Sequence, residues 1–276
     1  MTRRVVCVLS GGGARAAAHI GAIRALQEYD LAPAHFVGTS MGAVIGACFG
    51  SGLSYDEVLR RVSTVSRSDV ASFSPSVLLG PFGRSLLRAR PFRETLGLLV
   101  PADSFDALRV PVTVTAVDAS NGDLVLFGPG GRSHVPLLDA LYASCALPLY
   151  YPPALIGDRE YVDGGLRAVL PMDVAMQFAP DLVVGIHVGP SRHDQPPAVG
   201  IGAEGMVAAH RRALRIMMAV QAEETIRRWS DEMPAPHVVV LPKVTRAGTF
   251  ALDRIVEYVE QGYRGTVRAL NTSGVV

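Results

Sequence analysis

The sequence has no long apolar run: nothing in its 276 residues approaches the ~18 continuous apolar residues of a membrane-spanning helix. A secretory signal is missing as well, because Arg3 and Arg4 are followed by only five apolar residues before Ser10. We therefore expect neither a transmembrane segment nor a cleaved leader.

Cysteine is scarce. The three cysteines, Cys7, Cys48 and Cys145, lie in apolar segments and do not have the spacing of metal ligands. This pattern predicts buried, reduced thiols, which are typical of a protein that works in the cytoplasm, and it predicts no metal site.

Charge is also in short supply, with 18% charged residues and a net charge of +1 from 26 basic and 25 acidic side chains. This balance argues against a general attraction to nucleic acid or to an anionic membrane, and leaves open a local basic patch or a peripheral membrane contact. The apolar share of 49% is that of a globular chain with a large core. Because repeats and low-complexity linkers are absent, we expect residues 1–276 to form a single domain.

The N-terminal part of the chain alternates between strands and helices. An apolar, β-rich run at residues 5–9 is followed by three glycines, a helical pattern at 16–29, a second apolar strand at 34–37 and a sharp turn at Ser40. Such alternation predicts a mostly parallel sheet with right-handed crossovers, in which the turn at Ser40 follows the second strand.

Farther along, the pattern predicts strands at residues 110–117, 124–127, 161–163, 181–188 and 238–241, with a tight turn at Asn121-Gly122. Helices are predicted at residues 55–65, 91–99, 136–144, 171–178, 206–229 and 252–270. Residues 66–91 are predicted to be a loop with a short helix that covers one face of the domain. An ordered apolar loop is predicted at 146–153, and a polar segment expected to be mobile at 191–205.

The sequence around Ser40 has the form of a nucleophile elbow. Gly38 and Gly42 flank the serine two positions away on each side, as a tight strand-to-helix turn requires. The helix that follows directs its positive N-terminal dipole toward the hydroxyl. A plain glycine-containing turn is the alternative, since so short a pattern also occurs by chance.

A glycine loop precedes the elbow. Gly11, Gly12 and Gly13 directly follow a buried strand and open a helix, where backbone N–H groups can approach a ligand oxygen closely. The loop is therefore predicted to hold an oxyanion or a phosphate, or to be a tight turn without a ligand. A dinucleotide fingerprint is disfavoured because Ala16 replaces its third glycine, and a P-loop is excluded because no Gly-Lys-Ser/Thr sequence follows.

The base that would activate Ser40 is less evident. A common triad places aspartate and then histidine after the serine, and only His187 and His193 follow a strand at plausible positions. His187 falls within an apolar strand, and His193 falls in the proline-rich segment. Neither setting is typical of a catalytic histidine.

Asp163 is the better candidate for the base. It ends a short strand just before Gly164 and Gly165, where its carboxylate can face the mouth of the sheet or simply cap the turn. Burial in an apolar pocket would raise its pKa above the usual ~4 and strengthen its hydrogen bond to Ser40.

Together these motifs resemble those of the patatin-like phospholipase family. Residues 11–15 resemble its oxyanion loop, residues 18–22 the helix after that loop, and residues 38–42 its nucleophile elbow. Residues 143–153 resemble the loop before its aspartate motif, and residues 161–165 resemble that motif. The resemblance covers residues 5 to about 190, with about 191–276 as a helical completion, and it departs from the family at Ala16, where glycine is usual.

The resemblance implies a three-layer α/β/α sandwich and a Ser-Asp dyad that needs no histidine, metal or cofactor. By this analogy Ser40 is the nucleophile, Asp163 is the base, and a fatty-acyl ester of a phospholipid or lysophospholipid is cleaved through an acyl-enzyme. The oxyanion site is assigned to the loop Gly11, Gly12, Gly13, Ala14 and Arg15, with the N–H groups around Gly12 and Gly13 as donors.

A lipid substrate needs apolar walls. Candidates for an acyl site, each also explained as ordinary core, are Leu78, Leu79, Phe82, Leu86, Leu87, Leu147, Leu149, Tyr150 and Tyr151. The helix at 206–229 combines arginines with methionines, so it either lies on a membrane or, as we expect more strongly, packs its apolar face on the sheet.

Three hypotheses follow. The first is a cytoplasmic lipid acyl hydrolase that acts peripherally at membranes. The second is a small-ester hydrolase with a Ser-Asp-His triad that uses His187 or His193. The third is a catalytically idle lipid-binding or regulatory protein of the same fold.

Overall fold

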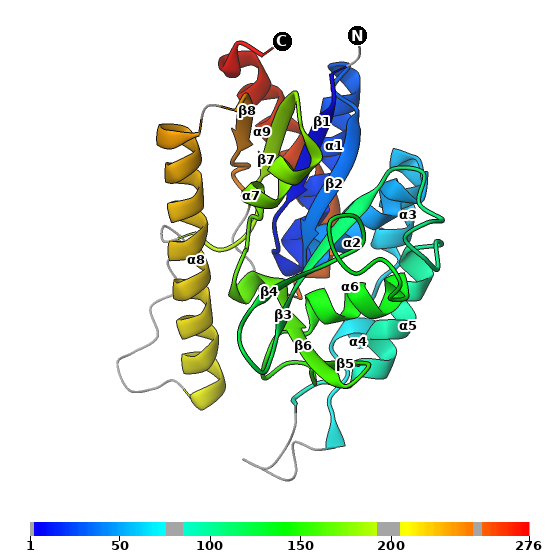
Figure 1. Cartoon of the computed structure of the whole chain (residues 1–276). Helices are drawn as coiled ribbons and strands as arrows, with labels where there is room; N and C mark the ends of the chain where they lie inside the picture. The colour runs from blue at the N-terminus through cyan, green and yellow to red at the C-terminus, as the bar shows by residue number, and fades with distance from the viewer. Residues whose placement is uncertain (1–2, 76–84, 192–204, 234, 245–249, 276) are drawn as a thin grey trace.

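The computed structural model describes residues 3–75, 85–191, 205–233, 235–244 and 250–275. In this part of the chain, eight strands form one sheet with helices on both faces (Figure 1). Most of the strands are parallel, so the expected α/β fold is confirmed.

The sheet is built outward from β1 (Val5–Leu9). It pairs in parallel with β2 (Pro33–Thr39) and β7 (Leu182–Ile186), and these pair in parallel with β3 (Val112–Asp118) and β8 (His237–Val240). Antiparallel strands extend the β3 side: β4 (Leu124–Phe127) and β6 (Arg159–Asp163) pair with β3, and β5 (Ala154–Ile156) pairs with β6. Because β1 and β7 are covered on both faces, their sequences are continuous apolar runs.

The α-helices are α1 (Ala18–Glu28), α2 (Met41–Gly50), α3 (Tyr55–Ser63), α4 (Arg67–Val70), α5 (Ala89–Leu99), α6 (Leu137–Cys145), α7 (Met172–Ala175), α8 (Met206–Glu232) and α9 (Ile255–Ser273). Short 3₁₀ helices are η1 (Gly13–Ala17), η3 (Gly164–Leu166), η4 (Met176–Phe178) and η5 (Leu252–Arg254).

Two hydrophobic clusters lie on opposite faces of the sheet. The larger joins one face of the sheet to side chains of α1, α2, α3, α5, α6 and α9. The smaller packs Met172 of α7 and Trp229 of α8 against the other face, where it meets Val6 and Val37. The protein is therefore a three-layer arrangement in which one helical layer is much thicker than the other (Figure 1).

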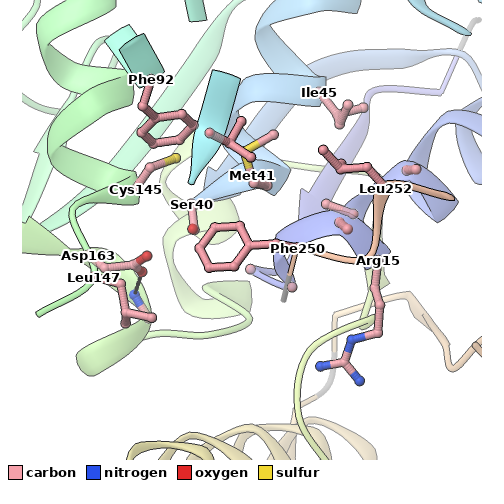
Figure 2. A pocket seen from close by; sticks show the side chains of 18 of the residues that line it. Arg15, Ser40, Met41, Ile45, Phe92, Cys145, Leu147, Asp163, Phe250 and Leu252 are labelled. Carbon is pink, nitrogen blue, oxygen red and sulfur yellow. Dashed lines mark hydrogen bonds between the residues drawn. The ribbon is translucent and has the colours of Figure 1, made fainter. Parts of the chain in front are cut away.

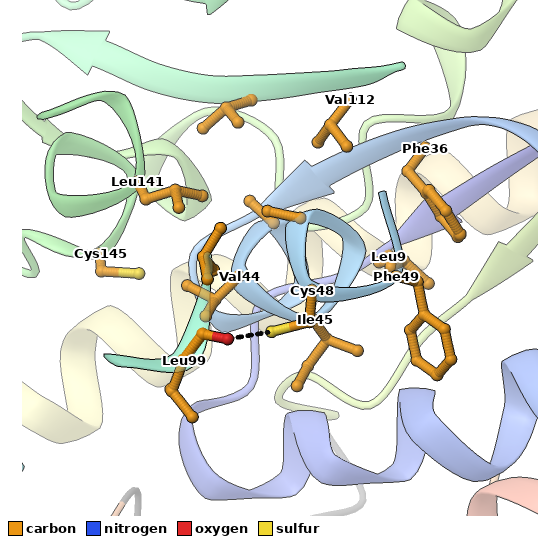
Figure 3. Close-up of a cluster of buried hydrophobic side chains, with 14 of the residues drawn as sticks. Leu9, Phe36, Val44, Ile45, Cys48, Phe49, Leu99, Val112, Leu141 and Cys145 are labelled. Carbon is orange, nitrogen blue, oxygen red and sulfur yellow. Dashed lines mark hydrogen bonds between the residues drawn. The ribbon is translucent and has the colours of Figure 1, made fainter. Parts of the chain in front are cut away.

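The helix α2 runs through the larger cluster. Its residues from Gly42 to Gly50 are all buried, and Val44, Ile45 and Cys48 project into the apolar cluster of Figure 3. The Cys48 thiol donates to the Leu99 carbonyl oxygen at 3.6 Å. A helix that is apolar all round is stable only when it is enclosed, so the start of α2 at Ser40 is held by the core itself.

The C-terminal segments join the same sheet and the same core. Strand β8 extends the sheet beyond β7, and α9 packs across α1. Glycines make this helix crossing close, because a Cβ at Gly21 would lie 1.9 Å from the Val259 oxygen and a Cβ at Gly262 would lie 1.9 Å from the Ala18 oxygen.

Several element boundaries differ from the sequence prediction. The helix expected at 16–29 starts at Ala18, because the preceding residues form the 3₁₀ helix η1. The helix expected at 171–178 is a single α-turn, α7, followed by η4. Strand β5 was not predicted, since three residues at a sheet edge carry no readable periodicity. The expectations for residues 76–84 and 192–204 lie outside the described residues.

The helix α8 packs on the protein along only part of its length. Its fully buried side chains are Ala219, Ala222 and Trp229, and the Trp229 indole N–H donates to Asp173 Oδ1 at 2.8 Å. In its first half, large apolar side chains are exposed, Met206 and Met217 among them. The prediction that this helix buries an apolar face on the sheet is therefore correct only for its C-terminal half. Among the described residues, no helix is both long and apolar enough to cross a membrane.

We predict that Gly262→Ala lowers the melting temperature, because the new methyl group meets backbone atoms of α1 that cannot move aside. The expected loss is roughly 1–3 kcal/mol or more. Gly97→Ala on α5 is the matched control: its Cβ would come no nearer than 4.0 Å to Leu138, so stability should rise by about 0.5–1 kcal/mol. Equal melting temperatures for the two variants would contradict the close α1–α9 crossing.

Candidate active site

Ser40 occupies a strained turn between β2 and α2. Its backbone angles are φ 53° and ψ −133°, a conformation that residues other than glycine rarely adopt. Ser40 is also the N-cap of α2. The flanking glycines make the turn feasible. A Cβ at Gly38 would lie 2.4 Å from Ala43 Cα, and a Cβ at Gly42 would lie 2.5 Å from the carbonyl oxygens of Leu9 and Ser10. The expected nucleophile elbow therefore has a steric basis at both glycines.

Ser144 of α6 holds the strained turn in place. Its buried hydroxyl accepts the Ser40 backbone N–H at 2.7 Å. The neighbouring Thr39 hydroxyl donates to the Ala168 carbonyl oxygen at 2.8 Å and lies 2.7 Å from Thr115 Oγ1. These bonds tie the turn to α6, to β3 and to the segment that follows Asp163.

Asp163 ends β6 and faces the same space as Ser40. Its side chain is buried, and its Oδ1 accepts the Gly165 N–H at 2.8 Å. Asp163 therefore also caps η3, which is the capping role that the sequence left open. Burial raises the pKa of Asp163 to about 6, against the opposing effect of the hydrogen bonds from the Gly165 N–H and the Ser40 side chain. The Asp163 carboxyl is therefore mostly ionised at neutral pH.

Cys145 lies on another side of Ser40. Burial raises the pKa of its thiol well above the usual range, the nearby Asp163 carboxylate raises it further, and a hydrogen bond with Ser40 acts in the opposite direction. The thiol therefore stays protonated at neutral pH. All three cysteines are buried and free, as expected.

The glycine loop lies against Ser40. A Cβ at Gly11 would be 3.3 Å from Ser40 Cβ, and Gly13 has a positive φ of 58°. The Gly11 N–H donates to the Val169 oxygen at 3.1 Å, so this residue lines the site but its N–H is already engaged. Gly12 and Gly13 open η1, where the first N–H groups have no acceptor within the helix.

Buried polar groups fix the base of this loop. The Ser10 hydroxyl accepts the Val188 N–H at 2.9 Å and donates to the Gly11 oxygen at 3.1 Å. His19 Nε2 lies 2.9 Å from the Ser10 oxygen, and burial lowers the pKa of His19 to about 4, so its ring is neutral. His19 therefore supports the loop and does not titrate at physiological pH.

A cavity of about 170 Å³ joins these elements. Ser40, Asp163 and the loop residues Gly11 to Arg15 line it, and Figure 2 shows the Arg15 guanidinium directed away from Ser40. Most of the remaining lining is apolar: Met41, Ile45, Val62, Val65, Val70, Phe92, Leu99, Leu147, Tyr150, Tyr151, Val169, Met218, Phe250, Leu252 and Ile255. A cavity of this size has room for roughly ten water-sized groups.

The acyl-site residues expected from sequence are only partly brought together. Leu147, Tyr150 and Tyr151 line the cavity, whereas Leu86, Leu87 and Leu149 do not. Leu78, Leu79 and Phe82 lie outside the described residues. Gly38, Gly42 and Gly164 shape the turns without lining the cavity, and Gly165 lines it.

No histidine lines the cavity in the part of the chain that the structure describes. His187 is buried near the glycine loop, where its Nε2 lies 3.2 Å from the Pro190 oxygen. His193 lies outside the described residues. Within the same described part, His, Cys, Asp and Glu side chains form no group of three that could hold a metal ion.

Sequence reasoning missed several residues of the site. Ser144 and Cys145 were given no role of their own, and Phe92, Met218 and Phe250 come from three distant segments. The place of Ser144 and Cys145 within residues 143–153, which resemble the loop before the aspartate motif, was the one available signal.

The chain matches the sequence profile of the patatin-like phospholipase family over residues 7–176. It belongs to the patatin-like phospholipase family. An uncharacterised NTE family protein of Mycobacterium tuberculosis is 31% identical over 198 residues, which cover 70% of this chain and 52% of the relative. The omega-hydroxyceramide transacylase of Homo sapiens is 36% identical over 171 residues, which cover 59% of this chain and 30% of the relative.

The chain thus spans about half the length of the mycobacterial relative and less than a third of the human one. Among solved structures, VipD from Legionella pneumophila aligns with 99% of this chain and 67% of its own, at 12% identity and a TM-score of 0.47.

The raised pKa of Asp163 predicts how stability depends on pH. Between about pH 4 and pH 6 the unfolded chain loses this proton before the folded chain does, so ionisation destabilises the fold as pH rises through that window. The full effect, on the order of 2–3 kcal/mol, applies above pH 6. Asp163→Asn should therefore melt higher than the wild type at pH 8, and the difference should shrink toward pH 4.5.

Asp118→Asn is the control of opposite sign. Hydrogen bonds from Ser120 and then Arg159 lower the pKa of Asp118 to about 2, so its ionised form stabilises the fold above about pH 4 and Asn should lower the melting temperature there. If Asp163→Asn also melted at a lower temperature than the wild type at pH 8, the ionised Asp163 carboxylate would not destabilise the folded protein.

Proposed function

We propose that this chain is a serine acyl hydrolase that cleaves fatty-acyl esters of phospholipids or lysophospholipids, with Ser40 as nucleophile and Asp163 as base. One observation carries the proposal. Ser40 and Asp163, a buried carboxyl whose pKa is raised to about 6, line the same apolar cavity. Membership of the patatin-like phospholipase family supports the same chemistry.

The first half of the reaction forms an acyl-enzyme. Ionised Asp163 accepts the Ser40 hydroxyl proton while Ser40 Oγ forms a bond to the ester carbonyl carbon. A base with a pKa of about 6 accepts this proton more readily than an ordinary aspartate does. The carbonyl oxygen gains the negative charge, and the N–H groups of Gly12 and Gly13 are the proposed donors to it.

Loss of the alcohol completes the acyl-enzyme, and water then releases the acid. As the intermediate collapses, Asp163 returns its proton to the departing alcohol oxygen, the ester C–O bond breaks, and the acyl group stays on Ser40. Water then gives a proton to Asp163 and attacks the acyl carbon, and the proton returns to Ser40 Oγ as the fatty acid leaves. One carboxyl thus serves as base and acid in turn.

The cavity favours an acyl chain as the buried part of the substrate. From Ser40, its lining passes to aliphatic and aromatic side chains of α2, α3 and α5, among them Ile45, Val62, Phe92 and Leu99. Burying a methylene there is favourable by about 0.8 kcal/mol. The name of the human relative, omega-hydroxyceramide transacylase, describes acyl transfer that involves a lipid, which supports a lipid acyl substrate here.

The test is hydrolysis of short-chain and long-chain acyl esters and of lysophospholipid. Ser40→Ala and Asp163→Asn should each lower kcat by at least about a thousandfold. For the wild type, kcat/KM should fall as pH drops below about 6, because Asp163 must be ionised to act as base.

His187→Ala is the matched control in the same assay, and activity close to that of the wild type is expected. Loss of activity in His187→Ala comparable with that of Ser40→Ala would favour the triad instead. Full activity in Asp163→Asn would refute the dyad, and a wild type without activity on any ester would favour an idle lipid-binding protein.

A further inference from the structure

The buried hydroxyl of Ser10 joins the glycine loop to the segment that follows β7. Its Oγ accepts the Val188 N–H at 2.9 Å and donates to the Gly11 oxygen at 3.1 Å. Ser10 is fully buried and does not line the cavity, so its side chain acts on the loop from below.

The Gly11 carbonyl sets the direction of the N–H group that follows it. The described chain has no cis peptide bond, so the Gly11–Gly12 peptide unit is planar and trans, and its N–H points opposite to its C=O. The Gly11 oxygen faces Ser10 Oγ and the segment after β7, since a Cβ at Gly189 would lie 2.9 Å from that oxygen. The Gly12 N–H is therefore directed away from this segment, and Gly12 lines the cavity together with Ser40.

His19 of α1 holds the carbonyl side of Ser10. Its Nε2 lies 2.9 Å from the Ser10 oxygen, and because a carbonyl oxygen can only accept, Nε2 carries the proton. Its Nδ1 is buried and has no hydrogen-bond partner within the described residues. The bond to Ser10 accounts for a histidine at this buried position, where an unpartnered polar atom is otherwise unfavourable.

Ser10 also lies against the nucleophile elbow. A Cβ at Gly42 would be 2.5 Å from the Ser10 oxygen, so the loop and the turn at Ser40 pack directly on each other. The Ser10 N–H donates to the Ile186 oxygen at 3.1 Å, which anchors the residue to β7. A rotation of the Ser10 backbone would therefore move the loop relative to Ser40.

We propose that Ser10 and His19 are positioning residues that aim the Gly12 N–H at the carbonyl oxygen of the reacting ester. The inference rests on the proposed function, in which this N–H stabilises the charge that develops on that oxygen. Neither side chain lines the cavity, so both act through the backbone of the loop. A misdirected donor still allows the substrate to bind but stabilises the transition state less, so kcat should fall while KM stays constant.

The experiment compares Ser10→Ala with the wild type in hydrolysis of a soluble short-chain acyl ester and in inhibition by an alkyl trifluoromethyl ketone. Ser40 Oγ adds to the ketone carbonyl carbon, its proton passes to Asp163, and the carbonyl oxygen becomes an oxyanion. Ser10→Ala should lower kcat about 10- to 100-fold with KM unchanged, and should raise the inhibition constant by a similar factor. The pH midpoint of kcat/KM, about 6, should not move, because Asp163 keeps its surroundings.

His19 supplies a second pair of variants, which tests the proposal even if Ser10→Ala folds poorly. Glutamine can place an amide N–H where His19 Nε2 lies, and the unpartnered Nδ1 is not needed, so His19→Gln should keep most of kcat. His19→Leu is similar in size but has no donor, and it should lose about tenfold in kcat.

Thr113→Val is the matched control. It removes a buried hydroxyl that donates to the Pro129 oxygen at 2.7 Å and that does not line the cavity. This variant should lower the melting temperature and leave kcat unchanged, which separates loss of stability from loss of oxyanion stabilisation.

The positioning role would be overturned by wild-type kcat and ketone inhibition in Ser10→Ala, by a raised KM with unchanged kcat, or by equal activities of His19→Gln and His19→Leu. Each of these results in an enzyme that cleaves esters leaves the proposed function intact. A wild type that cleaves no ester would refute the proposed function, and direct binding of the ketone would then measure the effect of Ser10→Ala. A wild type that also fails to bind the ketone would overturn both proposals.

Discussion

The carboxyl group of Asp163 is buried at the apolar cavity that Ser40 also lines. Burial disfavours its charged form, and the Gly165 N–H and the Ser40 hydroxyl only partly offset this. The fold must therefore hold the carboxylate firmly, because loss of the Gly165 N–H bond would leave its charge less compensated in an apolar cavity. The two residues are more than a hundred positions apart in the chain, so the sheet has to bring them together.

Strand β3 provides the link. It lies between β2, which ends at Thr39 just before Ser40, and β6, which ends at Asp163. Thr39 pairs with Thr115 of β3 and Asp163 pairs with Ala116, so the ends of the two outer strands lie close together. The contact is tight: a Cβ at Gly164 would lie 2.4 Å from Thr115 Oγ1. Ser144 then fixes the strained backbone of Ser40 from α6. The topology of the sheet, rather than any single interaction, sets the geometry of the pair.

The parallel sheet and the turns at Ser40 and Asp163 could be predicted from the sequence because their determinants are local. Gly38 and Gly42 are required by backbone atoms within or next to the turn, and Asp163 ends a strand directly before two glycines. The assignment of Asp163 over the histidines also drew on the family resemblance. Ser144, Phe92 and Met218 could not be assigned in this way, because each reaches the site through tertiary packing. For the same reason the pattern of α8 did not reveal that only its C-terminal half is covered.

The central claim is that Asp163 activates Ser40. The most direct measurement is the rate of labelling by a fluorophosphonate at different pH values, with the modified residue identified by peptide mass spectrometry. The account predicts labelling at Ser40, at a rate that rises with pH through about 6 and is strongly reduced in Asp163→Asn. Labelling at another residue, or labelling of Ser40 that is equally fast in Asp163→Asn, would contradict it.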